Sequence, residues 1–263
     1  MAVVNLTPDS FSGDGVGADI ERAIALAMAQ VEAGADILDL GAESSRPDAS
    51  PVAADEEITR LRPILRRLRD CGVPISVDTC KPEVMRVALG EGAAIINDIH
   101  ALERPGAIEA VRDSDCSVCL MHMKGEPDGM QVAPSYFDVV GEVARYLQGR
   151  VRSVGASGIA SERCWIDPGF GFGKTLEHNT ALFRALSVLV ETGVPVLVGV
   201  SRKSMLGAIT GRPVEERLAA SLSAAVLAAQ AGASVIRVHD VAATRDAITV
   251  WRALAPDFLG KQG

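Results

Sequence analysis

The chain has 263 residues and a formal net charge of −8, with 48% hydrophobic but only 4% aromatic residues. This length suits one large α/β domain, and the acidic balance argues against a nucleic-acid or anionic-membrane surface. No apolar run approaches the roughly 20 residues that span a bilayer, and the first residues lack a signal segment. We therefore expect a cytoplasmic protein whose partners are small molecules, with no nucleic acid and no membrane.

Apolar runs typical of buried strands alternate with helical patterns along the chain. We predict strands at residues 2–5, 37–40, 75–78, 94–97, 117–122, 165–167, 196–200 and 235–238. The clearest helical stripes, with apolar residues three and four apart, are Ile58, Leu61, Leu65 and Leu68, and then Phe137, Val140, Ala144, Leu147, Val151 and Val154. Gly34, Gly92 and Gly232 each end a helix just before the next strand.

Eight strand–helix units in this length predict an α/β fold, a TIM (β/α)8 barrel that forms a single domain over residues 1–263. The alternative is a doubly wound open sheet, which normally has a Gly-rich nucleotide turn after its first strand. The segment NLTPDSFS at residues 5–12 has no such turn. Because a barrel strand begins almost at residue 1, we expect the amino-terminal mouth of the barrel to be exposed.

The chain has five cysteines, an odd number that cannot all pair in disulfide bonds, which favours reduced thiols. Cys116 and Cys119 have the spacing of a redox or zinc motif. They fall in a predicted strand, where residues three apart point to opposite faces, so we expect a structural role for both.

Nearly every predicted strand stops in a residue that is able to bind a ligand. A barrel gathers such ends into one crater, although any single one could instead be a helix cap or a satisfied core polar group. In chain order the ends are Asn5, Asp39 with Glu43, Asp78, Asn97 with Asp98, His122, Asp167, Ser201 with Arg202 and Lys203, and Arg237 with His239.

These end residues divide by charge. Asp78, Asn97 and Asp167 suit the donor-rich edge of a flat heterocycle such as an amino-pyrimidinone, because a carboxylate accepts two parallel N–H bonds. The cations follow the seventh and eighth strands, where barrels commonly bind phosphate: Arg202, Lys203, Arg237 and His239. The pattern predicts a heterocycle that carries a phosphate.

The glycine-rich segment at residues 167–175 matches neither a P-loop nor a dinucleotide fingerprint, because Pro168 stands where a P-loop needs its first glycine. We expect its glycines to let the backbone approach a flat ligand, with Phe170 or Phe172 beside that ligand. The sequence shows no hydrolytic triad and no paired His or Cys metal site. A Mg²⁺ ion held mainly by substrate phosphates stays compatible with it, since such an ion needs few protein ligands.

Nine motifs occur in order along almost the whole chain: VNLTPDSFS (4–12), GADILDLG (34–41), ESSRP (43–47), ISVDTCKP (75–82), IINDI (95–99), LMHMKG (120–125), DPGFGFGK (167–174), SRKS (201–204) and RVH (237–239). As a set they resemble the dihydropteroate synthases, the folate-pathway enzymes that sulfonamides target. The resemblance implies a homodimeric, Mg²⁺-dependent enzyme. It would condense 6-hydroxymethyl-7,8-dihydropterin pyrophosphate with para-aminobenzoate, giving 7,8-dihydropteroate and pyrophosphate.

The resemblance also implies roles for particular residues. The pterin would be held by Asp78, Asn97, Met121, Asp167, Phe172 and Lys203. The pyrophosphate would be bound by Asn5, Arg46, Arg237 and His239, with Asn5 facing the Mg²⁺ ion. The aminobenzoate would lie among Phe11, Ser45, Arg46, Pro47, Lys203 and Ser204, on loops that close over the site. The residues expected to act in the reaction itself are Asp78, Lys203, Arg237 and His239.

Two other functions share parts of this pattern. A methyltransferase that uses a reduced folate has a carboxylate-lined pterin pocket but does not require the phosphate corner. A non-catalytic pterin-binding homologue is expected to have lost Asn5, Arg46 or Lys203, and all three are present. Ser45 and Asp48 depart from the family pattern in the second loop, which leaves the response to sulfonamides open.

Overall fold

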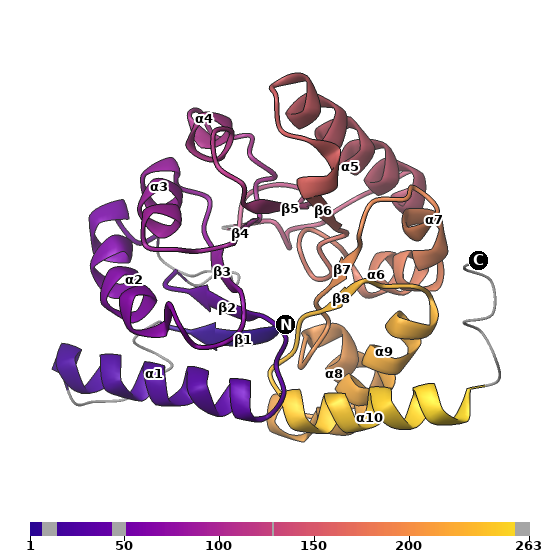
Figure 1. Ribbon diagram of the computed structural model, residues 1–263. Helices are drawn as coiled ribbons and strands as arrows, with labels where there is room; N and C mark the ends of the chain where they lie inside the picture. The colour runs from indigo at the N-terminus through magenta and orange to yellow at the C-terminus, as the bar shows by residue number, and fades with distance from the viewer. Residues whose placement is uncertain (7–14, 44–50, 128, 256–263) are drawn as a thin grey trace.

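The computed structural model describes residues 1–6, 15–43, 51–127 and 129–255, although the side chains of residues 15–19 lie outside that description. Parallel strands form the inner ring of the molecule and helices surround it (Figure 1). The strands are β1 Ala2–Asn5, β2 Leu38–Gly41, β3 Ile75–Asp78, β4 Ile95–Asp98, β5 Ser117–Met121, β6 Cys164–Asp167, β7 Leu197–Val198 and β8 Val235–Ile236.

The ring is closed by pairing between its first and last strands. Strands β1 to β6 form one continuous parallel sheet, and β7 pairs with β8. Single bridges join Ile166 to Val196 and Ala2 to Val238, so both seams are hydrogen-bonded. The predicted TIM barrel is therefore confirmed. The seventh strand is shorter than predicted because the chain turns at Val200, whose carbonyl accepts the amide of Lys203.

The helices follow the strands in the order expected of a repeated βα unit. They are α1 Gly15–Glu32, α2 Ala54–Leu68, α3 Pro82–Gly90, α4 Ala107–Val111, α5 Val139–Ala156, α6 Leu176–Arg184, α7 Leu186–Val190, α8 Ser204–Thr210, α9 Leu218–Gln230 and α10 Val241–Leu254. Gly34, Gly92 and Gly232 have positive φ angles of 92°, 99° and 96°, as the predicted helix ends require.

The two predicted helix stripes have different outcomes. In α2, Leu61, Leu65 and Leu68 are fully buried, as predicted. Phe137 is fully exposed, so its place in the second stripe is wrong. The reason is that Asp138 caps α5 by accepting the amide of Gly141, and the helix begins only after that cap.

The core lies mainly between the strands and the surrounding helices, in one cluster under α1 to α4 and another under α5 to α9. A small third cluster of Met1, Cys119 and Leu197 fills the amino-terminal part of the ring. Met1 is only 8% exposed, and its ammonium donates to the Ile236 carbonyl at 3.0 Å. The amino-terminal mouth is therefore partly filled rather than open, beside a hollow of about 480 Å³.

All five cysteines are free thiols. Cys116 and Cys119 are buried in different clusters, as expected of residues on opposite faces of a strand. No helix in the described part of the chain is long and apolar enough to cross a membrane.

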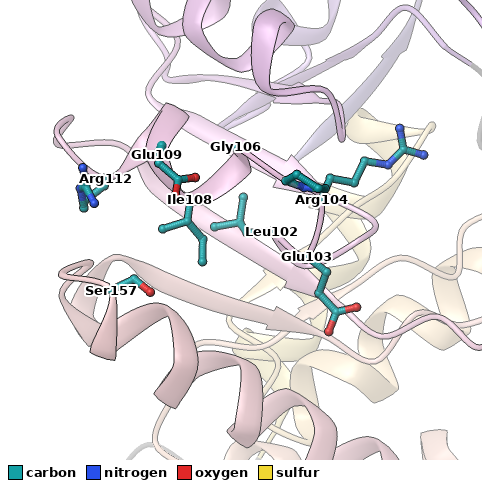
Figure 2. Close-up of a pocket in the computed structure, with 9 residues that line it drawn as sticks. Leu102, Glu103, Arg104, Gly106, Ile108, Glu109, Arg112 and Ser157 are labelled. Atoms are coloured by element: carbon teal, nitrogen blue, oxygen red, sulfur yellow. The ribbon is translucent and has the colours of Figure 1, made fainter.

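A hollow of about 370 Å³ lies on the outside of the barrel, next to α4 and the end of α5 (Figure 2). Figure 2 shows Leu102 and Ile108 between the segment that carries Arg112 and the one that carries Ser157. None of the residues predicted to bind substrate lines this hollow. The candidate site is therefore the crater at the carboxyl ends of the strands.

Candidate active site

The carboxyl edge of the ring carries acidic and amide side chains on neighbouring strands. Residues paired across a parallel ladder point to the same face, and the face alternates along each strand. Asp78 of β3 pairs with Asn97 of β4, while Asp167 of β6 pairs with Met121 of β5. The ladder thus places the predicted heterocycle-binding residues at one end of the ring, with Asp78 and Asn97 side by side.

Arg237, which follows β8, reaches two carboxylates from β2 and β3. Its Nε donates to Asp39 Oδ2 at 2.6 Å, and its Nη2 donates to Asp78 Oδ2 at 3.0 Å. Asn97 Nδ2 donates to the same oxygen of Asp39 at 3.3 Å. Burial raises the pKa of Asp78 to about 7, against the opposing effect of the Arg237 guanidinium. Three side chains from β2, β3 and β4 and the arginine that follows β8 therefore form one hydrogen-bonded network.

This network corrects the expected separation of carboxylates from cations. The sequence predicts Arg237 in a phosphate corner away from the acidic residues, whereas its guanidinium contacts both Asp39 and Asp78. Unpaired buried charges cost several kcal/mol each. The arginine therefore pairs with the carboxylates that lie nearest to it.

Lys203 supplies the second cation of the crater. It is the residue before α8, and its Nζ donates to the Phe170 carbonyl and lies 4.8 Å from the centre of the Phe172 ring. Burial lowers the pKa of Lys203 to about 8, although the negative charge of Asp167 opposes that shift. Phe170 itself is fully buried in the core. Of the two aromatic candidates, only Phe172 therefore lies at the site.

Asp167 is held by the loop that follows β6. Its Oδ1 accepts the amide of Gly169 at 2.7 Å, and burial raises its pKa while the charge of Lys203 lowers it. The loop then runs under Lys203, whose Cδ would lie 3.6 Å from a Cβ placed on Gly171. Asp167, Phe172 and Lys203 thus form a second group beside the arginine network.

Two glycines of this loop, Gly169 and Gly173, approach protein backbone rather than a flat ligand, which corrects the sequence interpretation for these two positions. A Cβ on Gly169 would lie 2.0 Å from the His122 carbonyl oxygen, and one on Gly173 would lie 2.2 Å from that of Lys124. Both glycines have positive φ angles, 66° and 61°. The loop after β6 therefore packs directly against the loop after β5, where any side chain would collide.

Lys174 holds these two loops together, a role that the sequence analysis missed. Its side chain is 3% exposed, and its Nζ donates to the carbonyls of Gly169, Phe172 and His122 at 2.9, 3.0 and 3.3 Å. It also lies 3.0 Å from His122 Nδ1. A lysine at the end of a glycine-rich loop was a signal for this role, but His122, its partner in the other loop, is 52 positions away.

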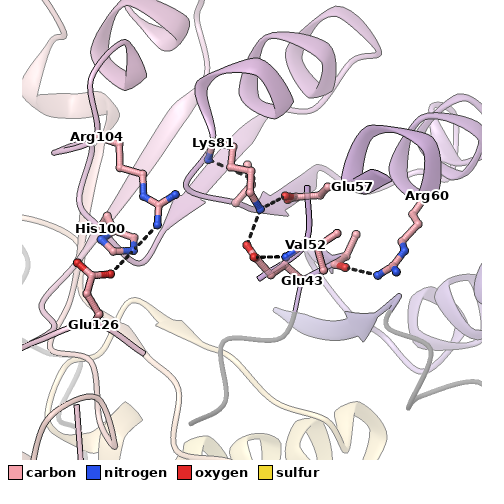
Figure 3. Close-up of polar contacts among 10 residues, drawn as sticks. Glu43, Val52, Glu57, Arg60, Lys81, His100, Arg104 and Glu126 are labelled. Carbon is pink, nitrogen blue, oxygen red and sulfur yellow. Dashed lines mark hydrogen bonds and ion pairs between the residues drawn. The ribbon is translucent and has the colours of Figure 1, made fainter. Parts of the chain in front are cut away.

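Several strand-end residues have structural partners instead of facing the crater freely. Asp98 accepts the amides of His100 and Leu102, both at 2.8 Å. Glu43 accepts from Lys81 at 2.7 Å, and the same ammonium bonds the buried Glu57 (Figure 3).

His122 and Arg202 also have partners within the protein. His122 packs edge-on against Tyr146, and burial lowers its pKa to about 3 with help from the Lys174 charge. Arg202 is exposed and pairs with Asp240, so it does not join the predicted phosphate corner.

The remaining predicted residues are placed as follows. Asn5 ends β1 and is half-buried, and Met121 ends β5 with 3% exposure. The amide of His239 donates to Ser201 Oγ at 3.3 Å, and Ser204 begins α8 on the surface. Four predicted residues lie outside the described residues: Phe11, Ser45, Arg46 and Pro47.

The fold and the site together define a (β/α)8 barrel with a small-molecule site of carboxylates, an amide and two cations at its carboxyl edge. A family model described as pterin binding enzyme matches residues 1–239. The dihydropteroate synthase of Neisseria meningitidis serogroup C is 50% identical over 259 residues, which cover 97% of this chain and 92% of that protein. The Escherichia coli K12 enzyme is 46% identical over 254 residues, 96% and 90% of the two chains.

Solved structures give the same result. The dihydropteroate synthase of Yersinia pestis in a sulfonamide complex superposes with a TM-score of 0.91 at 42% identity, covering 96% of this chain and 92% of that one. That of Xanthomonas albilineans with 7,8-dihydropteroate gives 0.87 at 48% identity, with the same coverage. The chain belongs to the dihydropteroate synthase family of pterin-binding enzymes.

Proposed function

We infer that the chain is a transferase of folate biosynthesis that condenses 6-hydroxymethyl-7,8-dihydropterin pyrophosphate with para-aminobenzoate, releasing pyrophosphate and 7,8-dihydropteroate. The single observation that carries this function is the crater in which Asp78, Asn97, Asp167, Lys203 and Arg237 meet at one edge of the barrel. The relatives named dihydropteroate synthase match this chain almost end to end.

The chemistry follows from the charges at the site. The carboxylates of Asp78 and Asp167 and the carboxamide of Asn97 suit the N–H edge of the pterin. As the C–O bond breaks, positive charge spreads over the ring, and nearby carboxylates stabilise it. Arg237, His239 and Arg46 would stabilise the departing pyrophosphate, and the weakly basic aromatic amine would capture the pterin cation. This dissociative route needs no essential general base.

Mg²⁺ is the cofactor that we propose. Among the described residues, no group of three or more His, Cys, Asp or Glu side chains could hold a metal ion. An ion held mainly by substrate phosphates needs few protein ligands, and the half-buried carboxamide of Asn5 would be its protein ligand. The ion would neutralise negative charge on the departing pyrophosphate.

Purified protein supplied with the pterin pyrophosphate, Mg²⁺ and para-aminobenzoate is expected to release pyrophosphate only when all three are present. Removal of Mg²⁺ with a chelator should stop the release, because the leaving group then keeps its full charge. A coupled pyrophosphate assay measures this directly. If the protein binds the pterin but releases no pyrophosphate, the non-catalytic alternative holds. Methyl transfer from a reduced folate would favour the methyltransferase.

The pH dependence of kcat/KM is expected to be bell-shaped, with limbs near pH 7 and pH 8. Burial raises the pKa of Asp78 to about 7, so its carboxylate is lost as the pH falls below that value. Burial lowers the pKa of Lys203 to about 8, so its charge is lost as the pH rises above it. Steady-state assays from pH 5.5 to 9.5, at subsaturating pterin pyrophosphate, measure both limbs.

The Lys203→Arg variant is the matched test of the alkaline limb. Arginine keeps its proton throughout this range, so the limb near pH 8 should disappear while the acid limb stays. An alkaline limb of unchanged position in this variant would show that another group causes it.

We also propose that the chain forms a homodimer. Of the nine large apolar side chains that are more than 40% exposed among the described residues, five lie on the last helices, α8, α9 and α10: Ile209, Leu218, Leu227, Val250 and Leu254. Such a surface is expected at an interface between copies. Sedimentation of the purified chain tests the dimer. The cytoplasmic location expected from the sequence stays a prediction, which cell fractionation would test.

A further inference from the structure

The carboxylate of Asp39 lies at the centre of the network, deeper than the groups expected to touch substrate. It is fully buried within β2. Its Oδ2 accepts from Arg237 Nε at 2.6 Å and from Asn97 Nδ2 at 3.3 Å. Its Oδ1 is buried and has no hydrogen-bond partner among the described residues. A buried carboxylate with one unsatisfied oxygen is a poor source of stability, which favours a role in the site.

Asp39 determines which end of the Asn97 carboxamide faces the crater. An ionised carboxylate can only accept hydrogen bonds, so the amide must turn its Nδ2 toward Asp39. The Oδ1 of Asn97 is then left as an acceptor for the N–H groups of a ring. With the opposite amide orientation, Asn97 would present a donor to another donor.

Asp39 also holds Arg237 independently of Asp78. The guanidinium uses different nitrogens for the two carboxylates, Nε for Asp39 and Nη2 for Asp78. A pterin that bonds both oxygens of Asp78 competes with Nη2 of Arg237 for Asp78 Oδ2. The Nε contact can persist, since Asp39 lies below the ligand-facing edge at the second residue of its strand.

We propose that Asp39 is a positioning residue, which orients the Asn97 amide toward the pterin and anchors Arg237 while its contact with Asp78 is exchanged for the pyrophosphate. The proposal rests on the function proposed above. Asp39 touches neither substrate, and it acts on the pterin through Asn97 and on the pyrophosphate through Arg237.

The Asp39→Asn variant tests this role by binding rather than by turnover. A neutral amide no longer dictates the orientation of Asn97, and it removes the charge that holds Arg237. Fluorescence titration with 6-hydroxymethylpterin, and calorimetry with inorganic pyrophosphate and Mg²⁺, should each show affinity about 10-fold weaker than wild type. In steady state, the KM for the pterin pyrophosphate should rise while the KM for para-aminobenzoate stays unchanged.

Asp98→Asn is the matched control. Asp98 is also a fully buried carboxylate, one strand position after Asn97, but among the described residues its side chain bonds only the amides of His100 and Leu102. This variant should lower the thermal midpoint and leave both affinities of the folded protein unchanged. Asp39→Asn should instead weaken both affinities and keep the thermal midpoint within about 4 °C of wild type.

Combination with Arg237→Ala shows whether Asp39 acts through the arginine. In that background, Asp39→Asn should weaken pyrophosphate binding by less than about 2-fold further, because residues that act as one unit are not additive. Wild-type affinity for both probes in Asp39→Asn would overturn the proposal, as would a fully additive loss in the double variant. Binding of neither probe by the wild type would instead overturn the proposed function.

Discussion

Replacing Lys203 with alanine is expected to lower kcat/KM for the pterin pyrophosphate by about 100- to 1000-fold, or about 3 to 4 kcal/mol. The ammonium donates to the Phe170 carbonyl and lies over the Phe172 ring. Burial raises the pKa of Asp167, and the charge of Lys203 is the largest effect that lowers it again. Its loss therefore removes a cation from the crater and favours the protonated form of a carboxylate that the pterin needs ionised.

Steady-state kinetics with both substrates varied measures this loss. Arg202→Ala is the matched control, because Arg202 is the neighbouring cation but is exposed and pairs with Asp240. It should change kcat/KM by less than about 3-fold. Near-normal turnover in Lys203→Ala, or an equal loss in both variants, would remove Lys203 from the site.

Lys174→Met is expected to lower the free energy of unfolding by about 3 kcal/mol or more. The buried ammonium is bonded to three backbone carbonyls and lies against His122. Methionine fills similar space but donates nothing, so those carbonyls lose their partner. Because this loop carries Phe172 and its Gly169 amide bonds Asp167, pterin affinity should fall as well.

Urea denaturation of the two proteins measures the difference, with Lys124→Met as the control. Lys124 is 45% exposed, and its replacement should cost less than about 1 kcal/mol. Stability within 1 kcal/mol of wild type in Lys174→Met, a margin of about the cost of one hydrogen bond, would show that Lys174 does not hold the loops.

The difference in stability between the wild type and Lys174→Met is expected to depend on pH. Burial lowers the pKa of Lys174 to about 7, below the ordinary lysine value of 10.5. Between those values the unfolded chain binds more protons at this residue than the folded chain does, so wild-type stability relative to Lys174→Met should rise with pH from 7 to about 10. A fall over that range would contradict the assigned pKa.

Most of the fold could be predicted because its signals are local. Buried parallel strands leave continuous apolar runs, and β1 and β3 have the predicted bounds. The second helix stripe failed at Phe137 because spacing alone could not show that Asp138 would cap the helix. The shortened β7 depends on a turn, which the apolar run 196–200 does not reveal.

The site was only partly predictable, because position at a strand end does not reveal a partner. Asp98 follows Asn97 directly, yet alternation along β4 turns it away toward backbone amides. Lys174 lies in a motif whose glycines indicated a ligand, while its side chain bonds carbonyls of its own loop and of the loop after β5. The central role of Asp39 depends on Arg237, which is 198 residues away and could be found only in three dimensions.

The most direct measurement is a crystal structure of the protein with 6-hydroxymethylpterin and inorganic pyrophosphate. We expect the N–H edge of the ring on the carboxylates of Asp78 and Asp167, the Asn97 oxygen toward the ring, and the pyrophosphate beside Arg237 with its Nε still on Asp39. A ring bound away from those carboxylates, or a pyrophosphate that leaves Arg237 paired with Asp78, would contradict the account.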